Sequence, residues 1–314
     1  MLLAEWLKEL QMDEDDIAEI LAKDAYYGSQ IAPLAEGYMN GGAGRVFKSF
    51  TNDEIKAGRE AALSWLGKAR QLAQTEEEDY MLQLLFWLHC IPYLEQEYQR
   101  RGIGKEVLIN SLMDLTYKTR ECRKKFGCCG VTTQRYYRFF RLGMFGLGRL
   151  QFNPMAYEKE TYRFGDYTLN TGDRVYACHI PSSGKLTPEL CMDSLDRAYN
   201  FFKKDIRGDI LPVRCSSWLL YPPYVEKVFP EGSNMKSFAQ MFDIVSTAPT
   251  AEDLYVAQAV FGKLAWADID SFPQETALQR NFVSYIKSGG GFGSGYGILL
   301  YDGVRKEIIN KPIT

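Results

Sequence analysis

Hydrophobic and polar residues alternate with two different periods along the chain. Up to residue 130, apolar positions recur every three or four residues, as on one face of an amphipathic helix. The clearest such stripes lie within residues 55–72, 82–94 and 107–117. Beyond residue 148, short segments alternate with a period of two, which is typical of half-buried strands. The change in period predicts a helical first half followed by a mixed α/β second half.

Local signals mark several element ends in the first half. Thr51 and Glu54 form the pattern of a capping box, which begins a helix. A run of acidic residues at 76–79 suits the start of the next helix, because negative charge complements the positive end of the helix dipole. Residues 26–50 are rich in glycine and predict a loop with one short helix near 31–39.

A glycine-containing turn at residues 127–130 separates the two patterns. We place a domain boundary there, with an all-α N-terminal domain over 1–130 and a mixed α/β C-terminal domain over 131–314. The fold class is therefore an α+β two-domain arrangement. Residues 133–142 are basic and aromatic and predict a linker helix that packs on the sheet, in preference to a nucleic-acid contact.

The central pattern of the second half is a strand, a short loop and a helix. Residues 174–180 are β-branched, aromatic and apolar, as in a buried strand. Pro181 to Leu186 end it with loop residues. Thr187, Pro188 and Glu189 then begin a helix, with a hydroxyl at the N-cap and proline at the first helical position. The helix extends to about Lys204.

Such a corner leaves backbone N–H groups unpaired at the positive end of a helix dipole, so it can bind an anion such as phosphate. An ordinary structural corner is the alternative. Residues 211–220 form the next predicted strand. Because a helix connects the two strands, they are expected to run parallel.

Further segments of the second half carry shorter signals. Gly165 and Asp166 predict a hairpin turn. Helices are predicted at 224–228, 235–240, 252–261 and 276–288, and strands at 242–246 and 298–301. The glycine-rich run 289–297 lacks the lysine and the following helix of a phosphate-binding P-loop. A mobile loop, or a close approach of the backbone to a ligand or neighbour, fits that run better.

Composition excludes some classes of function. The 314 residues have a net charge of −3, which gives no support to sequence-independent nucleic-acid binding. Basic clusters at 120–125 and 135–141 are interpreted as helix faces. No uncharged apolar run is long enough to span a membrane. The seven cysteines lack disulfide or zinc spacing, so we expect reduced thiols in a cytoplasm and no metal site.

Several short motifs, in chain order, resemble landmarks of a bacterial family of two-domain acyltransferases. In that family a helical N-terminal domain precedes a domain similar to the GNAT (N-acetyltransferase-like) fold. The resemblance covers essentially the whole chain and rests on residues 145–152 (FGLGRLQF), His179-Ile180-Pro181 with Gly184, 217–220 (SWLL), 233–235 (SNM) and 278–280 (LQR).

The resemblance implies an N-acyltransferase that uses acyl-CoA, with CoA as the released product, and acts on an amine of a small molecule or peptide. It implies that the pantetheine arm lies between the two parallel strands. The resemblance also assigns CoA binding to the loop that follows the first of these strands. The CoA-binding residues that it implies are Ile180, Ser182, Ser183, Gly184 and Lys185. His179 and Ser217 are the implied catalytic residues.

Amine acylation requires a base for the amine and donors for the tetrahedral oxyanion. His179 suits the base because an imidazole titrates near neutral pH, although a hydrogen-bonded structural histidine that braces the loop is the more usual state of such a residue. Ser216 and Ser217 could orient substrate. Cys215 could be a nucleophile, although a buried core thiol is the more usual state of such a residue.

Two departures from the superfamily keep a second interpretation open. The loop usually reads Gln/Arg-x-x-Gly-x-Gly/Ala, and here only Gly184 matches. The tyrosine that often protonates the leaving thiolate falls near Met241, where no tyrosine is present. A non-catalytic module that binds CoA or another nucleotide, or a protein-interaction module with a degenerate GNAT fold, is therefore the alternative. The oligomeric state and the acceptor are not specified by the sequence.

Overall fold

The computed structural model describes residues 2–41, 46–48, 50–250, 254–262, 266 and 268–310. The chain forms two compact units, which are described separately. The first comprises residues 1–147, 151–156 and 180–183, and the second comprises 148–150, 157–179 and 184–314. The predicted boundary between residues 130 and 131 stays a prediction.

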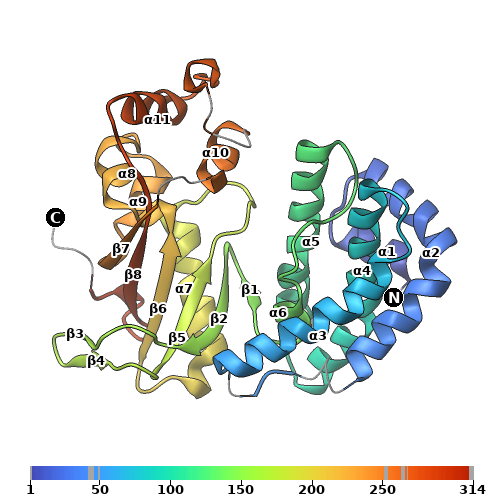
Figure 1. Cartoon of the computed structure of the whole chain (residues 1–314). Helices are drawn as coiled ribbons and strands as arrows, with labels where there is room; N and C mark the ends of the chain where they lie inside the picture. Colours follow the sequence, from blue (N-terminus) through green and yellow to red (C-terminus); the bar gives the residue numbers. More distant parts are fainter. Residues whose placement is uncertain are drawn as a thin grey trace. The chain divides into compact units, whose positions relative to one another are not determined.

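The first unit is built mainly from helices (Figure 1). Their starts follow the capping rules: the Thr51 hydroxyl accepts the Glu54 N–H at 3.3 Å, and the Thr75 hydroxyl accepts the Glu78 N–H at 3.2 Å. The helices are α1 (Leu3–Glu9), α2 (Glu14–Asn40), α3 (Asn52–Arg70), α4 (Glu76–Arg100), α5 (Lys105–Phe126) and α6 (Tyr137–Phe140).

Helix α2 corrects the sequence-based prediction of a loop over 26–50. It continues without a break to Asn40, through Pro33 and several glycines. The reason is tertiary packing. A Cβ on Gly37 would lie 2.5 Å from the Trp65 ring of α3, so this glycine allows two helices to approach closely. Glycine here serves packing and does not mark a turn.

The core of the first unit surrounds α4, where Trp87 is fully buried. The Trp87 ring stacks on Phe140 of α6, with 5.1 Å between ring centroids. The predicted linker helix at 133–142 is shorter than expected, because only Tyr137–Phe140 is α-helical. Its aromatic residues are buried, since Phe139 and Phe140 are each only 1% exposed, but the ring contact of Phe140 is with Trp87 of α4 and not with the sheet as predicted.

Strands β1 (Phe145–Leu147) and β2 (Leu150–Ala156) follow the helices. Gly146 of β1 lies directly on α5: its N–H donates to the Ser111 hydroxyl at 2.8 Å, and a Cβ there would lie 2.5 Å from the Asn110 backbone. Gln151 of β2 donates its side-chain amide to the Asp114 carboxylate at 3.1 Å, and both side chains are buried.

The second unit contains most of a mixed sheet (Figure 1). The order of the seven-stranded sheet is β1-β2-β5-β6-β8-β7, with β9 paired to β8, while β3 and β4 form a separate hairpin. The strands are β3 (Tyr162–Phe164), β4 (Tyr167–Leu169), β5 (Arg174–His179), β6 (Ile210–Ser217), β7 (Asp243–Thr250), β8 (Phe292–Asp302) and β9 (Glu307–Ile308).

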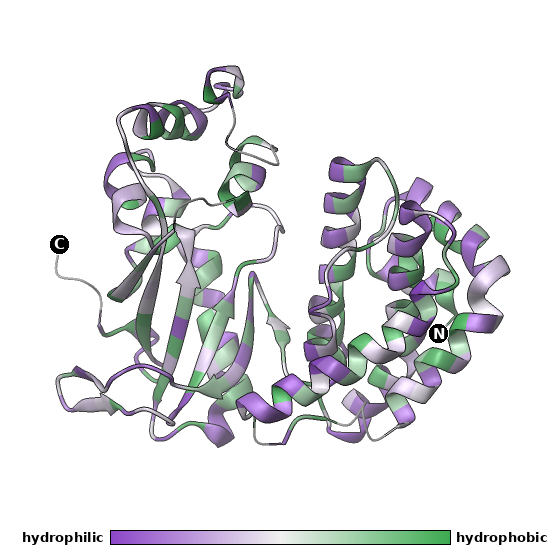
Figure 2. Cartoon of the chain, viewed as in Figure 1, coloured by the Kyte–Doolittle hydropathy of each residue, from purple (hydrophilic) through white to green (hydrophobic). Residues whose placement is uncertain are grey.

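The helices of this unit are amphipathic, and both colours appear on them in Figure 2. They are α7 (Pro188–Phe202), α8 (Pro222–Lys227), α9 (Asn234–Ala239), α10 (Leu254–Phe261) and α11 (Ala277–Lys287). The predicted start of α10 at residue 252 lies outside the described residues. The hairpin around Gly165 is confirmed, as is the parallel pairing of β5 with β6.

Strand β8 corrects the prediction of a strand limited to 298–301, because it begins at Phe292 inside the glycine-rich run. Gly293, Gly295 and Gly297 alternate along one face of the strand. A Cβ on them would lie 2.6 Å from Tyr221, 2.0 Å from the Leu220 carbonyl oxygen and 2.8 Å from Phe242, respectively. The glycines thus permit close approach of neighbouring residues, which was one of the two interpretations offered by the sequence.

The burial of Asp114 can be tested through the pH dependence of the free energy of unfolding. Burial raises the pKa of this carboxyl above its ordinary value of 3.8. The folded state therefore favours the protonated carboxyl. The contribution of this carboxyl to the free energy of unfolding is fully present below the pKa of Asp114 in the unfolded chain, and it is lost as pH rises through the pKa in the folded protein. We expect Asp114→Asn, compared with the wild type, to gain unfolding free energy between pH 4 and pH 7 in urea titrations.

Asp13→Asn is the matched control with the opposite sign. The Arg120 side chain donates hydrogen bonds to Asp13 and lowers the pKa of its carboxyl. Its contribution is therefore present above the unfolded pKa and is lost as pH falls. Because Asp13 is exposed, the effect is small. An Asp114→Asn difference that stays constant between pH 4 and pH 7 would contradict the prediction.

Candidate functional site

Strands β5 and β6 are in register over a short length only. The registered parallel pairs are Tyr176 with Val213 and Ala177 with Arg214. Both strands continue beyond this point, to His179 and Ser217, without a further registered pair among their described residues. The registered pairing of the two strands therefore ends before their carboxyl ends, and the loop 180–187 leads from this end of β5 into α7.

The start of α7 is capped as the sequence predicts. The Thr187 hydroxyl accepts the Leu190 N–H at 3.4 Å, and Pro188 is at the first helical position. The Glu189 carboxylate also lies at this helix end. Its own backbone N–H and the Thr187 hydroxyl lower the pKa of Glu189. The helix terminus thus already holds one negative charge.

Arg149 fixes the shape of the loop that precedes α7. Its Nε donates to the Lys185 carbonyl at 2.9 Å, and its Nη2 donates to the Gly184 carbonyl at 3.1 Å. In a trans peptide the N–H points away from the preceding C=O, so the N–H groups of Lys185 and Leu186 point away from Arg149. Neither N–H has a protein acceptor among the described residues.

The turn that carries Arg149 is anchored to α7. Gly148 and Arg149 form the two-residue turn between β1 and β2, and Gly148 has a φ of +76°. The Leu150 N–H donates to the Ser194 hydroxyl at 3.1 Å, and that hydroxyl donates to the Leu190 carbonyl at 2.9 Å. The turn and the loop are therefore both held against the first turns of one helix.

The predicted CoA-binding residues have different environments within the loop. Ile180 is half-buried, and Ser182, Gly184 and Lys185 are exposed. The Ser182 hydroxyl donates to the Glu121 carboxylate, and the Ser183 N–H donates to the Pro181 carbonyl at 2.8 Å. Gly184 has a φ of +80°, a conformation that favours glycine.

The two predicted catalytic residues differ in a similar way. His179 is the last residue of β5 and is half-buried. Ser217 ends β6, and its hydroxyl accepts the Leu219 N–H at 3.2 Å, so it caps the short 3₁₀-helix over Trp218–Leu220. Ser216, its neighbour, is exposed. The catalytic roles of His179 and Ser217 stay predictions.

Side chains alternate along a strand, so the residues near this end fall on two faces of the sheet. His179 and Ser216 each lie two residues beyond the registered pair Ala177–Arg214 and share its face. On β8, Tyr296 is the registered partner of Ser216. His179, Ser216 and Tyr296 therefore belong to one face at the carboxyl ends of β5 and β6.

Tyr296 was not identified from the sequence. Arg214 and Lys159 lie over its ring, with 5.8 Å and 5.3 Å to the ring centroid. Burial raises the pKa of Tyr296 to about 12, so the phenol stays protonated at neutral pH. Such a group can donate a proton. Its sequence context, between glycines, gave no signal of this environment.

The opposite face of the same strands carries buried thiols. A hydrogen bond from the Cys178 thiol to Cys215, together with burial, raises the pKa of Cys178 well above its ordinary value. Burial likewise raises the pKa of Cys191, on α7, to about 11. A thiol that stays protonated is a poor nucleophile. The arrangement supports the interpretation of these residues as core thiols.

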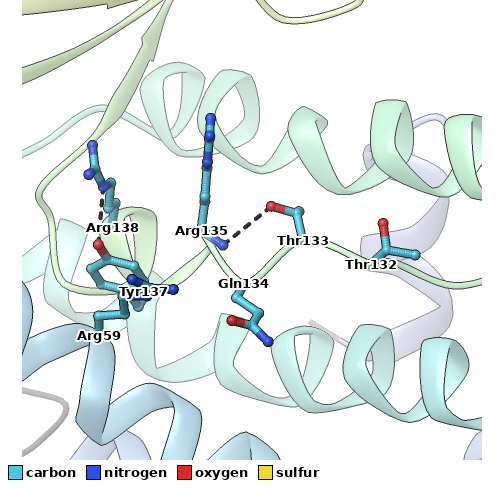
Figure 3. A pocket seen from close by; sticks show the side chains of 7 residues that line it. All are labelled: Arg59, Thr132, Thr133, Gln134, Arg135, Tyr137 and Arg138. Atoms are coloured by element: carbon cyan, nitrogen blue, oxygen red, sulfur yellow. Dashed lines mark hydrogen bonds between the residues drawn. The ribbon is translucent and has the colours of Figure 1, made fainter. Parts of the chain in front are cut away.

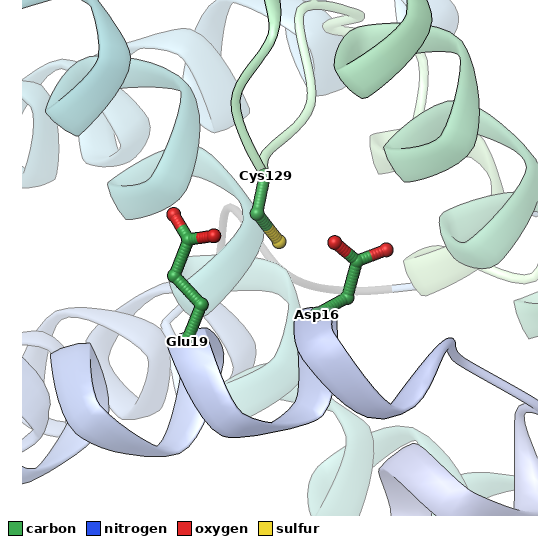
Figure 4. Close-up of side chains that lie close together, drawn as sticks. All are labelled: Asp16, Glu19 and Cys129. Atoms are coloured by element: carbon green, nitrogen blue, oxygen red, sulfur yellow. The ribbon is translucent and has the colours of Figure 1, made fainter.

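Asp16, Glu19 and Cys129 form a cluster of possible metal ligands in the first unit (Figure 4). Their ligand atoms lie within 4.8 Å of one another. Arg123 Nη2, however, lies 2.5 Å from the Asp16 carboxylate and 2.7 Å from that of Glu19. The guanidinium already neutralises these carboxylates, and the geometry is that of an ion-pair network.

A mixed sheet with a parallel pair of strands flanking a loop and a helix places the second half in the GNAT-like class. Family models identify both halves: residues 1–142 match the N-acyltransferase N-terminal domain, and residues 144–299 match the GNAT-like C-terminal domain. The chain belongs to the family of two-domain acyltransferases that combines these domains, as its sequence motifs predicted. By family it is an acyltransferase.

Solved structures show the same fold. An acyltransferase in complex with decanoyl-CoA and teicoplanin is 20% identical, with a TM-score of 0.64 over 94% of this chain and 86% of that chain. An acyltransferase in complex with decanoyl-CoA is 18% identical, with a TM-score of 0.59 over 95% and 99% of the two chains. None of the curated proteins compared with the chain matches it significantly. Among the described residues, no helix combines the length and apolar character needed to cross a membrane.

Gly148→Ala tests the anchoring of the Arg149 turn. The new Cβ would lie 2.9 Å from the Ser194 hydroxyl and 3.1 Å from the Asp193 carboxylate, in a left-handed conformation. We expect the free energy of unfolding in urea to fall by about 2–4 kcal/mol from strain and overpacking together.

Gly165→Ala is the control, because Gly165 also has a positive φ, of +54°, but a Cβ there meets no atom within 4 Å. Its cost is the backbone contribution alone, about 1 kcal/mol. Equal losses for the two variants would show that the contact with α7 does not constrain the turn.

Proposed function

We propose that this protein transfers an acyl group from acyl-CoA to an amine nitrogen of a small-molecule or peptide acceptor. The observation that carries the proposal is the corner at the carboxyl ends of β5 and β6, in a chain of the N-acyltransferase family. There the registered pairing of the strands ends, and the loop presents two backbone N–H groups that have no acceptor in the described part of the chain.

The ligands of the structural neighbours support this proposal. Those acyltransferases were crystallised with CoA, decanoyl-CoA or octanoyl-CoA, and two of the complexes also contain teicoplanin or 10C-teicoplanin. A medium-length acyl-CoA is therefore the first donor to test. Teicoplanin suggests a peptide-like amine as the first acceptor. The non-catalytic alternative is not favoured, because both domains belong to an acyltransferase family.

The reaction needs two proton transfers, one from the attacking amine and one to the leaving thiolate. The amine attacks the thioester carbonyl, a C–N bond forms, and the amine gives up a proton to a base. We assign that base to His179, at the end of β5. The C–S bond then breaks, and the leaving thiolate takes a proton, for which the protonated Tyr296 phenol on the same face is a candidate. Ser217 stays a candidate for orienting substrate.

The diphosphate of CoA is assigned to the loop 180–185, including Ile180, Ser182, Ser183, Gly184 and Lys185. Lys185 and Arg149 contribute positive charge there, and the N–H groups of residues 185 and 186 are available as donors. Glu121 and Glu189 oppose it, since each places a carboxylate on the loop or at the helix start. Binding therefore depends on the backbone donors more than on net charge.

A bacterial cytoplasm is the location that we propose. All seven cysteines are unpaired, and six of them are buried, as expected for a reducing compartment. This proposal also rests on the resemblance described above.

Arg149→Lys tests the assignment of the loop. Lysine keeps the positive charge but cannot donate the forked pair of hydrogen bonds that fixes the Gly184 and Lys185 carbonyls. We expect the affinity for CoA, measured by isothermal titration calorimetry, to fall by about tenfold. Arg207→Lys is the matched control, because that side chain is 94% exposed, and it should bind CoA as the wild type does. Equal affinity for both variants would relocate the CoA site.

His179→Ala tests the base. With decanoyl-CoA and a panel of peptide and glycopeptide amines, release of free CoA thiol should slow by about 10²–10⁴-fold. A base that must be deprotonated makes kcat/KM of the wild type rise with pH, and the variant should lose this dependence. A variant that stays within threefold of the wild-type rate, with the same pH profile, would make His179 a structural residue.

A further inference from the structure

Three arginines converge on one pocket of the first unit. Arg59, Arg135 and Arg138 line a cavity of about 400 Å³ (Figure 3). The remaining lining residues are Thr132, Thr133, Gln134 and Tyr137, which are polar and uncharged. Its volume falls within the range of small-molecule sites in proteins. The sequence indicated only basic helix faces here, because Arg59 lies on α3, far from Arg135 and Arg138 in the chain.

Local structure holds these side chains in place. Arg59 projects from α3, and Arg138 belongs to α6. The Arg138 Nε donates to the Tyr137 hydroxyl at 3.3 Å, and the Arg135 N–H donates to the Thr133 hydroxyl at 3.4 Å. In Figure 3 the Arg135 and Arg138 side chains extend in the same direction from the chain. All three side chains line the same pocket, with Arg59 beside Tyr137 in this view.

None of these three guanidinium groups has a carboxylate within ion-pair distance among the described residues. Other arginines of the same unit do: Arg70 lies 2.6 Å from Asp79, and Arg123 lies 2.5 Å from Asp16. Asp114 interacts electrostatically with Arg135, but the Asp114 side chain is buried and already accepts a hydrogen bond from Gln151. The pocket thus concentrates uncompensated positive charge in a chain of net charge −3.

A fourth arginine lies beside α3. Arg141 is only 6% exposed, and its Nε lies 2.8 Å from the position of a Cβ on Gly58, the neighbour of Arg59. Within the described ranges that Nε has no hydrogen-bond partner, and Glu54 acts electrostatically on the guanidinium. Burial of a cation is costly, and Arg141 adds positive charge on this side of α3.

We propose that the pocket binds a small ligand through an oxyanion group, either a phosphate or a carboxylate. Guanidinium groups donate paired hydrogen bonds to both, and the threonine and glutamine side chains can bind the uncharged part of the ligand. The proposal does not rest on the proposed acyl transfer, because the residues that line the pocket all belong to the first unit.

Calorimetric titration of the full chain at low ionic strength tests the proposal, with inorganic phosphate and citrate as probes. We expect saturable binding of at least one probe. The double variant Arg135→Gln/Arg138→Gln should bind at least tenfold more weakly, and Arg59→Gln, on an exposed helix face, should bind more weakly without affecting folding. Stronger binding of phosphate would indicate a phosphorylated ligand, and stronger binding of citrate a carboxylated one.

Arg100→Gln is the matched control. Arg100 is exposed on α4 and pairs with Glu97, outside the pocket, so this variant should bind both probes as the wild type does. Equal affinity of the pocket variants and Arg100→Gln would overturn the proposal, as would the absence of saturable binding in the wild type. Neither result would bear on acyl transfer, because CoA binding is measured separately at the loop.

Discussion

Parallel pairing of β5 with β6 is the constraint on which the candidate site depends. Two parallel strands cannot be joined by a tight turn, so the chain must leave the carboxyl end of β5, cross over as α7 and return. That path brings the N-terminus of α7 to the end of the sheet where the registered pairing of β5 and β6 stops. The crossover from β5 through α7 to β6 thus places the loop, its backbone donors and His179 at this end of the sheet, whatever the sequence of the loop.

Elements set by local chemistry could be predicted from the sequence. Thr187 and Pro188 specify a helix start by themselves, and Gly165 with Asp166 specifies a hairpin, so both predictions are confirmed. Glycines were harder to interpret, because their meaning depends on residues far away in the chain. Gly37 permits contact with Trp65, and Gly295 permits contact with the Leu220 carbonyl. Neither partner is visible in a local window, so a long helix and a long strand were both predicted too short.

The candidate site shows the same division. His179 and the loop residues could be proposed because they follow one strand directly. Arg149 and Tyr296 could not, since Arg149 acts on a loop 35 residues later and Tyr296 reaches the site through its antiparallel pairing with Ser216. The arginine pocket likewise combines α3 with a segment more than 70 residues further on. The charge pattern of the sequence indicated only a basic cluster. Whether these arginines are free to bind an anion depends on which acidic side chains lie near them in the folded chain.

Arg149 holds the loop through carbonyl oxygens, which every amino acid carries. These hydrogen bonds place no requirement on the exposed side chain at position 185, whereas Gly184 is restricted by its positive φ and Leu186 by its burial. A loop held in this way can tolerate substitution of most residues of a nucleotide-binding motif without a change in its backbone conformation. The departure of this loop from the usual pattern of its superfamily then reflects a change of support, from the motif itself to an arginine supplied by a distant turn.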